Sequence, residues 1–290
     1  MQIRTFFRAL ACAVVLHSPV VFAKPNELVK PASVLIKPTA ALQSQQFELE
    51  TAPNLRVLAK KLAQAPVSPL NARKLLKIYE YCGFFAGPKT RKEWVDLFLP
   101  TVKADDPFRG RRIALANAGY GRCEALLLET PDVFEERARW LKLAAAGGDV
   151  VAKLMLRQLV SPTAETIAGF ESELKAALNS SDPEAIWEAA RAISLAGFGW
   201  GNLSEKPWPD KEVDSLRAVF QLAACELGMP CGAQSNLITN FCIRGTCAAQ
   251  SYAEWLPTFL SAPQYQAVNA ELPRVLSEIK AGRGAALIFH

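Results

Sequence analysis

Apolar residues recur at intervals of three and four along most of this chain, from about Pro53 to Ala281. This spacing places an apolar stripe on one face of a helix and leaves polar side chains on the other. The clearest stripe consists of Val213, Leu216, Val219, Phe220, Ala223, Ala224 and Leu227. Strand patterns are almost missing, and only the tail 285–289 could be extended. The sequence therefore predicts an all-α fold of roughly eleven helices of ordinary length.

The expected helices begin and end at residues that cap helices. Ser181, Ser251 and Ser261 each precede a Glu or Gln by three residues, which is the spacing of a capping box. Stops are expected near glycines, at Gly83, Gly119, Gly147, Gly197, Gly228 and Gly282. Short connections make neighbouring helices pack as antiparallel hairpins. We predict an irregular, α-solenoid-like stack of such hairpins in one domain, residues 51–290, with a subdivision near residue 161 as an alternative.

The first 23 residues have the three parts of a secretory signal peptide. Arg4 and Arg8 make the start positive, residues 9–21 are mostly apolar, and Val21 and Ala23 offer a cleavage site. The apolar run is too short for a membrane-spanning helix, which needs about 20 residues. We predict cleavage near Ala23, a periplasmic or secreted location, a flexible leader over residues 24–50, and no membrane span.

Six of the seven cysteines follow this signal peptide. An even number in an exported chain predicts three disulfides. Cys82 and Cys123 lie far in sequence from the other four cysteines, so we pair them with each other. Their bridge would close a loop of roughly 40 residues, worth about 4 kcal/mol of stability in the chain-entropy account.

The other four cysteines lie within 23 residues, at positions 225, 231, 242 and 247. If residues 232–242 are helical, Cys231 and Cys242 lie roughly 16 Å apart, which is too far for a bridge. We therefore predict Cys225–Cys231 and Cys242–Cys247, with Cys225–Cys242 and Cys231–Cys247 as the alternative. A zinc site built from all four cysteines is a further alternative, but their spacing fits the usual zinc motifs poorly.

Histidine is nearly missing from the exported part of the chain. Loss of the signal peptide leaves 31 Lys and Arg, 28 Asp and Glu, and a single histidine, His290. A Ser-His-Asp or Cys-His mechanism needs an imidazole held in place, and a terminal residue frays. We assign no catalytic, cofactor-binding or metal-ligating residue, and we expect no cofactor and, for an exported chain, no nucleic acid partner.

Residues 140–156 read Trp-Leu-Lys-Leu-Ala-Ala-Ala-Gly-Gly-Asp-Val-Val-Ala-Lys-Leu-Met-Leu. Small residues such as Ala144 and Ala152 let two helices approach closely, and Gly148-Asp149 suits the end of one helix and the start of the next. This stretch resembles a Sel1-like repeat, a relative of the tetratricopeptide repeat. The resemblance implies a helical hairpin and an adaptor role, because stacked helix pairs create extended concave surfaces.

Two tryptophans, Trp200 and Trp208, lie in a segment rich in glycine and proline, residues 197–209. Their rings could stack on a sugar or contact a partner protein, since Trp supplies a large amphipathic area. The interpretation we favour is that both rings cover a long connection between helices.

A compact basic patch is formed by Arg109, Arg111 and Arg112. It is a second candidate interaction surface, for an anionic polymer. Asp105 and Asp106 lie beside it, and we expect them to pair with part of it.

Acidic residues are the remaining candidates for chemistry, in three groups: Glu124 and Glu129; Glu135 and Glu136; and Asp182, Glu184 and Glu188. A glycosidase needs two carboxylates about 5 to 9 Å apart in a cleft, but acids at helix starts also stabilise the helix dipole. We favour the second interpretation for each group.

These observations favour an exported helical module that binds protein or cell-envelope partners. The alternative is an envelope enzyme that acts on glycan through paired carboxylates. Two facing carboxylates in a deep pocket would favour the enzyme, and a shallow pocket would favour the module.

Overall fold

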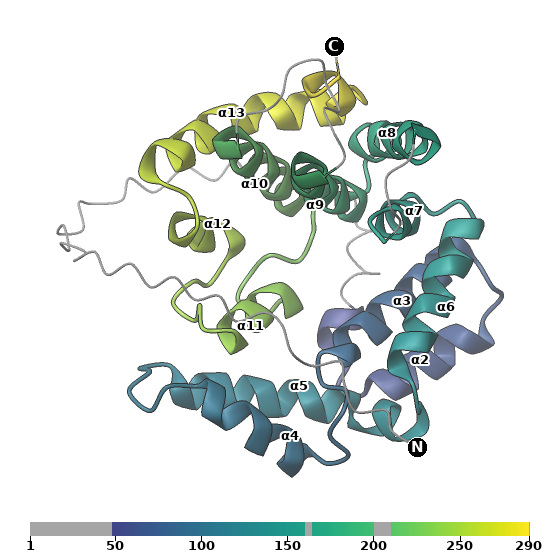
Figure 1. Ribbon diagram of the computed structural model, residues 1–290, viewed down its shortest axis with the longest axis vertical. Coiled ribbons are helices and arrows are strands. Elements are labelled where there is room, and N and C mark those ends of the chain that lie inside the picture. Colours follow the sequence, from purple (N-terminus) through teal and green to yellow (C-terminus); the bar gives the residue numbers. More distant parts are fainter. Residues whose placement is uncertain (1–47, 160–163, 200–209, 290) are drawn as a thin grey trace, which may run out of the picture. The chain divides into compact units, whose positions relative to one another are not determined.

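The computed structural model describes residues 48–159, 164–199 and 210–289 (Figure 1). The chain divides into two units, Met1–Leu35 and Ile36–His290, and every described residue belongs to the second. The predicted signal peptide with its cleavage site near Ala23, residues 24–47 of the leader, and both Trp200 and Trp208 lie outside the described residues.

The described residues form helices and no strand, which confirms the all-α prediction. A helical turn at 48–51 is followed by α2 (Leu55–Gln64), α3 (Pro69–Gly83), α4 (Arg91–Phe98), η1 (Leu99–Thr101), α5 (Arg109–Glu129), α6 (Val133–Ala146), α7 (Val150–Arg157), α8 (Ala164–Leu178), α9 (Pro183–Gly199), α10 (Asp210–Glu226), α11 (Asn236–Ile243), α12 (Tyr252–Trp255), η2 (Leu256–Thr258), α13 (Ala262–Lys280) and η3 (Gly284–Leu287). The tail is a 3₁₀ turn, so the expected extended conformation of 285–289 is wrong. None of the described helices has the length and apolar character needed to cross a membrane.

Each helix from α6 to α9 packs against the next helix in the chain, as predicted for hairpins (Figure 1). Other contacts join helices that are distant in sequence: α3 packs on α6, α2 on α5, α11 on α5, and α10 on α13. A solenoid-like order therefore stays a prediction. Helices α7 and α8 contact each other and both contact α9, so described residues on the two sides of position 161 pack together; the alternative subdivision gains no support from these contacts.

The expected hairpin at 140–156 is present as α6 and α7. Gly148 has a positive φ of 95°, a conformation that glycine adopts without steric cost. Asp149 then accepts the Ala152 N–H at 2.8 Å and caps α7. Ala144 and Ala152 are fully buried, so the two small residues allow close packing of the hairpin.

Of the capping boxes predicted at Ser261 and Ser181, the first forms and the second does not. Ser261 and Gln264 form the expected box at the start of α13. Ser181 does not cap α9; the carboxylate of Asp182 accepts the Glu184 N–H at 2.9 Å. The cap lies one residue later because α9 begins at the following proline, Pro183.

Gly119 was expected to end a helix but lies inside α5. A Cβ atom at this position would lie 2.4 Å from Cζ of Phe85 and 3.1 Å from the hydroxyl of Tyr81. The glycine is therefore needed for the close approach of α5 to the end of α3. The sequence alone shows only a glycine in a helical pattern and cannot separate this role from a stop.

The three disulfides are Cys82–Cys123, Cys225–Cys231 and Cys242–Cys247. These are the favoured pairs, and they contradict both the crossed pairing and the four-cysteine zinc site. Cys82–Cys123 joins α3 to α5, and the other two close short turns around α11. The long-range bridge therefore constrains the fold most.

Replacement of Cys82 and Cys123 by alanine should lower the free energy of unfolding by about 4 kcal/mol, because the bridge closes a loop with a sequence separation of 41. The matched control is the Cys225/Cys231 pair, whose separation is 6 and whose loss should cost about 2 kcal/mol. Urea unfolding of the oxidised proteins gives both values. A larger loss for the control pair would contradict the loop-closure account.

Candidate functional site

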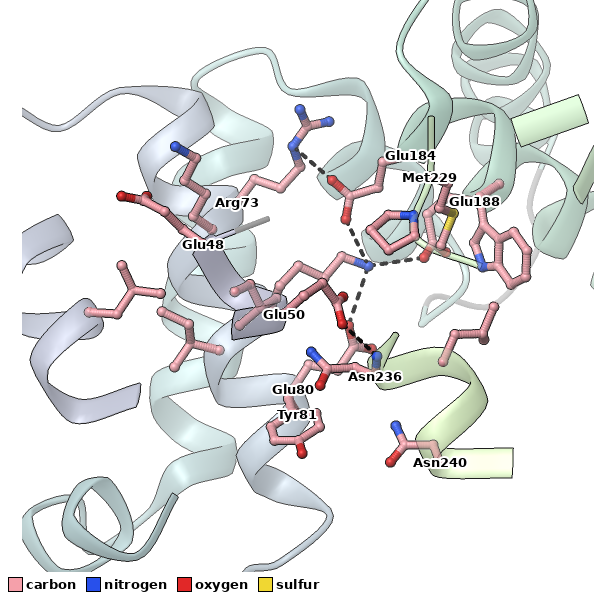
Figure 2. Close-up of a pocket in the computed structure, with 18 of the residues that line it drawn as sticks. Glu48, Glu50, Arg73, Glu80, Tyr81, Glu184, Glu188, Met229, Asn236 and Asn240 are labelled. Atoms are coloured by element: carbon pink, nitrogen blue, oxygen red, sulfur yellow. Dashed lines mark hydrogen bonds and ion pairs between the residues drawn. The ribbon is translucent and has the colours of Figure 1, made fainter. Parts of the chain in front are cut away.

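A cavity of about 390 Å³ lies between the turn 48–51, α2, α3, α9 and α11 (Figure 2). One part of its lining is apolar and chiefly aliphatic: Leu49, Leu58, Leu62, Leu70, Ile78, Phe84, Trp187, Met229, Pro230 and Leu237. The remainder carries charged and amide side chains. Cavities of this size and mixed lining hold small ligands, so we take this cleft as the candidate site.

Lys77 of α3 lines the charged part of the cleft and contacts three of its carboxylates. Its Nζ lies 3.1 Å from a carboxylate oxygen of Glu188, 3.3 Å from Glu184 and 3.4 Å from Glu80. Burial opposes the charge of Lys77, but these carboxylates outweigh it and raise the pKa of the ammonium group. Glu188 is only 1% exposed, and a carboxylate this buried needs counter-ions; Lys77 lies 3.1 Å from one of its oxygens and Nη1 of Arg191 lies 3.0 Å from the other.

Arg73, one turn earlier on α3, binds a second set of carboxylates. Its Nη1 lies 2.6 Å from Asp182, and its Nε lies 3.4 Å from both Asp149 and Glu184. The guanidinium group thus joins α3 to the first turns of α7 and α9. The sequence cluster Asp182, Glu184 and Glu188 is therefore ion-paired throughout, in agreement with the structural role that we favoured for it.

The turn at 48–51 forms another wall of the cleft. Residues 48–50 were assigned to a flexible leader, and this boundary is wrong, because they are helical and half-buried. The backbone N–H of Asn236 donates to the carboxylate of Glu50 at 2.5 Å (Figure 2). Burial raises the pKa of Glu50 to about 7, against the opposing effects of this hydrogen bond and of the Arg122 charge. Glu50 therefore titrates near neutral pH.

Arg122 of α5 holds this wall in place from behind. It donates to the carbonyl groups of Leu49 and Ala52, the latter at 2.9 Å, and to Oδ1 of Asn236 at 2.8 Å. One side chain thus joins the turn, α5 and α11. Neither Glu50 nor Arg122 could be identified from the sequence, because nothing in the local pattern brings positions 50, 122 and 236 together.

The predicted basic patch does not form an open surface. Arg112 is buried and donates to the carbonyl group of Ile243 at 2.8 and 3.0 Å, and to Asp106 at 2.6 Å. Arg109 and Arg111 also donate to backbone carbonyl groups, at 2.6 and 3.1 Å. The expected pairing with Asp106 is confirmed. The donors of the patch stabilise the loop before α5 and the end of α11, and its role as an anion-binding surface stays a prediction.

The other acidic pairs of the sequence lie outside the cleft lining. Glu124 is bound by Arg91 at 2.7 Å, and Glu129 by Lys60 at 2.9 Å. Across the described ranges, no group of three or more His, Cys, Asp or Glu side chains is arranged to hold a metal ion. Of the three acidic groups, the one that lines the cleft is therefore Asp182, Glu184 and Glu188.

Comparison of the chain with protein-family models, with curated proteins and with solved structures finds no match. The cleft is therefore interpreted from its own residues.

Replacement of Lys77 by methionine should lower the free energy of unfolding by about 2 kcal/mol at pH 7, because Glu184 and Glu188 lose a shared buried counter-ion and Glu188 keeps only Arg191, at 3.0 Å. The control is Lys92→Met, whose side chain is 85% exposed and pairs with Asp96 on the same helix. This control should leave the urea midpoint unchanged. Equal effects of the two substitutions would show that the buried pair does not hold the cleft together.

The stability of the protein should depend on pH through Glu50. The folded-state pKa of Glu50, about 7, lies above the ordinary value of 4.5, so its contribution is fully present below pH 4.5 and is lost as the pH rises through 7. Relative to Glu50→Gln, the wild type should lose roughly 2 to 3 kcal/mol between pH 4.5 and 8. Urea unfolding across this range measures the difference, and parallel curves for the two proteins would contradict the raised pKa.

Proposed function

We propose that this chain is an exported α-helical binding module and that the cleft between α3, α9 and α11 is its ligand seat. The observation that supports this best is the composition of the cleft, with aliphatic side chains on one part of the lining and ion-paired carboxylates on the other. Because Lys77 and Arg73 hold these carboxylates in place, the cleft is formed before a ligand arrives. Preformed clefts of this kind bind with less loss of conformational entropy.

An extracytoplasmic location is part of the proposal, with a signal peptide at 1–23 cleaved near Ala23 and a periplasmic or secreted mature chain. The three disulfides support it, because such bonds persist in oxidising compartments and are rare in the cytosol. The partners that we propose are proteins or cell-envelope components.

The Sel1-like resemblance of residues 140–156 supports an adaptor role of this kind. The hairpin of α6 and α7 is connected to the cleft through its turn, since Asp149 caps α7 and also lies 3.4 Å from Arg73. The segment that resembles an adaptor repeat thus contacts Arg73, which lines the proposed ligand seat.

A glycan-acting enzyme is the second candidate, and one observation favours it. Glu50 has a pKa of about 7, suitable for a general acid at neutral pH. Burial also raises the pKa of Glu184, although Lys77 and Arg73 oppose the effect. A glycosidase needs a second carboxylate that is free to act on the sugar, whereas Glu80, Glu184 and Glu188 each contact Lys77. The binding module accounts for more of the cleft.

Photo-crosslinking in intact cells tests the ligand seat. With p-benzoylphenylalanine in place of Met229, which lines the cleft, the full chain should form adducts with its partner. The control position is Leu128, which is 69% exposed on α5 and lies outside the lining. Adducts at Met229 should disappear when the cleft is filled by Leu237→Trp.

Equal labelling at the two positions, or labelling at Met229 that Leu237→Trp leaves unchanged, would contradict the ligand seat. Mass spectrometry of the adducts separates the two candidates. Adducts that contain only carbohydrate would favour the glycan-acting enzyme.

A further inference from the structure

Two asparagines, Asn236 and Asn240, lie one turn apart on α11 and both line the cleft. Figure 2 shows that their amide groups point from α11 toward the side of the cleft where Tyr81 lies. Glu50 lies beside the first of them, because the backbone N–H of Asn236 donates to its carboxylate. The two amides thus form a neutral polar strip in the lining, beside its aliphatic and its charged parts.

One atom of each amide is buried and has no hydrogen-bond partner among the described residues: Nδ2 of Asn236 and Oδ1 of Asn240. The orientation of the Asn236 amide follows from its partner, since its Oδ1 accepts from Arg122 at 2.8 Å and Nδ2 must therefore face the other way. Buried polar atoms in folded proteins are nearly always satisfied. A donor and an acceptor that lack partners at the wall of a cleft therefore point to a ligand that supplies an acceptor and a donor.

The spacing of the two amides identifies the class of ligand. Residues four apart on a helix are separated by roughly 6 Å along its axis. An extended peptide presents backbone groups on the same edge about every 6.8 Å, which is two residues. A single extended segment that runs along α11 can therefore meet both asparagines.

The remainder of the lining suits the side chains of such a segment. Alternate side chains of an extended peptide point to one face, and the half-buried lining residues Leu58, Leu70 and Leu237 are available to receive them. A sugar finds fewer suitable surfaces among the lining residues, because their single tryptophan, Trp187, is only 7% exposed. The cleft therefore favours a peptide over a glycan.

We propose that the cleft binds a partner protein through an extended peptide segment, with a peptide carbonyl accepting from Nδ2 of Asn236 and a peptide N–H donating to Oδ1 of Asn240. The proposal rests on the cleft being the ligand seat. Both residues are half-buried and line the cleft, and the terminal torsion of asparagine is soft, so a rotation of each amide brings its buried atom to the ligand.

The probe is an octapeptide selected from a random phage-displayed library on the full-length protein. Its affinity is measured by fluorescence anisotropy, together with that of derivatives N-methylated at single backbone positions. N-methylation removes the peptide N–H without changing the side chains. Chitotetraose is tested in parallel as a glycan probe.

Three variants report on the contacts. Asn240→Leu removes the acceptor, and Asn236→Asp removes the donor while keeping the oxygen that Arg122 binds. Each should weaken peptide binding about five- to tenfold, the loss expected for one hydrogen bond. The control, Asn269→Leu on α13, lies outside the cleft and should leave the affinity unchanged. N-methylation at one position should weaken binding to the wild type but have little further effect on Asn240→Leu.

Unfolding in urea shows whether the variants fold. Asn240→Leu should be at least as stable as the wild type, because it removes a buried acceptor that lacks a partner. A peptide that fails to bind Leu237→Trp but binds both asparagine variants as tightly as the wild type would overturn the inference. The ligand seat would then still be supported. A cleft that binds chitotetraose and no peptide would also overturn it. Failure of the ligand seat itself is recognised separately, by equal photo-labelling at positions 229 and 128.

Discussion

The ion pairs that α3 makes with the first turns of α9 determine how the rest of the cleft is built. Lys77 and Arg73 bring positive charge to the carboxylates of Asp182, Glu184 and Glu188. A carboxylate as buried as Glu188 needs counter-ions, since desolvation would otherwise dominate, and Lys77 and Arg191 supply them. Because each buried charge of the network has its partners on the other helix or one turn away, the network keeps the two helices in one arrangement and gives the cleft a defined wall.

A second set of contacts holds the wall that is formed by the turn at 48–51 and by α11. These contacts come from α5, next to a disulfide. Cys82–Cys123 joins α3 to α5, and the neighbouring Arg122 then reaches the carbonyl groups of the turn at 48–51 and the side chain of Asn236. Glu50 completes this wall through its hydrogen bond with Asn236. The cross-link thus supports the cleft as well as the stability of the helices.

The polar groups of the cleft divide into two kinds with different chemical uses. Carboxylates bound by Lys77 and Arg73 already have their counter-ions, so they shape the site and contribute little to proton transfer. Glu50 and the amides of Asn236 and Asn240 are different, because one titrates near pH 7 and the others have atoms without partners in the described part of the chain. The two amides suit a neutral, hydrogen-bonding ligand, whereas Glu50 is the group that would suit acid and base chemistry.

Local patterns of the sequence determined the helices, the hairpin at 140–156 and the disulfide pairs, because helix periodicity, capping and short-range cysteine geometry act over a few residues. The roles of Gly119 and of Arg109, Arg111 and Arg112 could not be predicted in this way, since they depend on what packs against these residues. The site itself was decided by tertiary structure alone. Its hydrogen bonds join Arg73 to Asp182, Lys77 to Glu188 and Asn236 to Glu50 across 109, 111 and 186 positions. No local spacing encodes such pairs, because charge pairing in a cleft requires that folding first bring the helices together and exclude water.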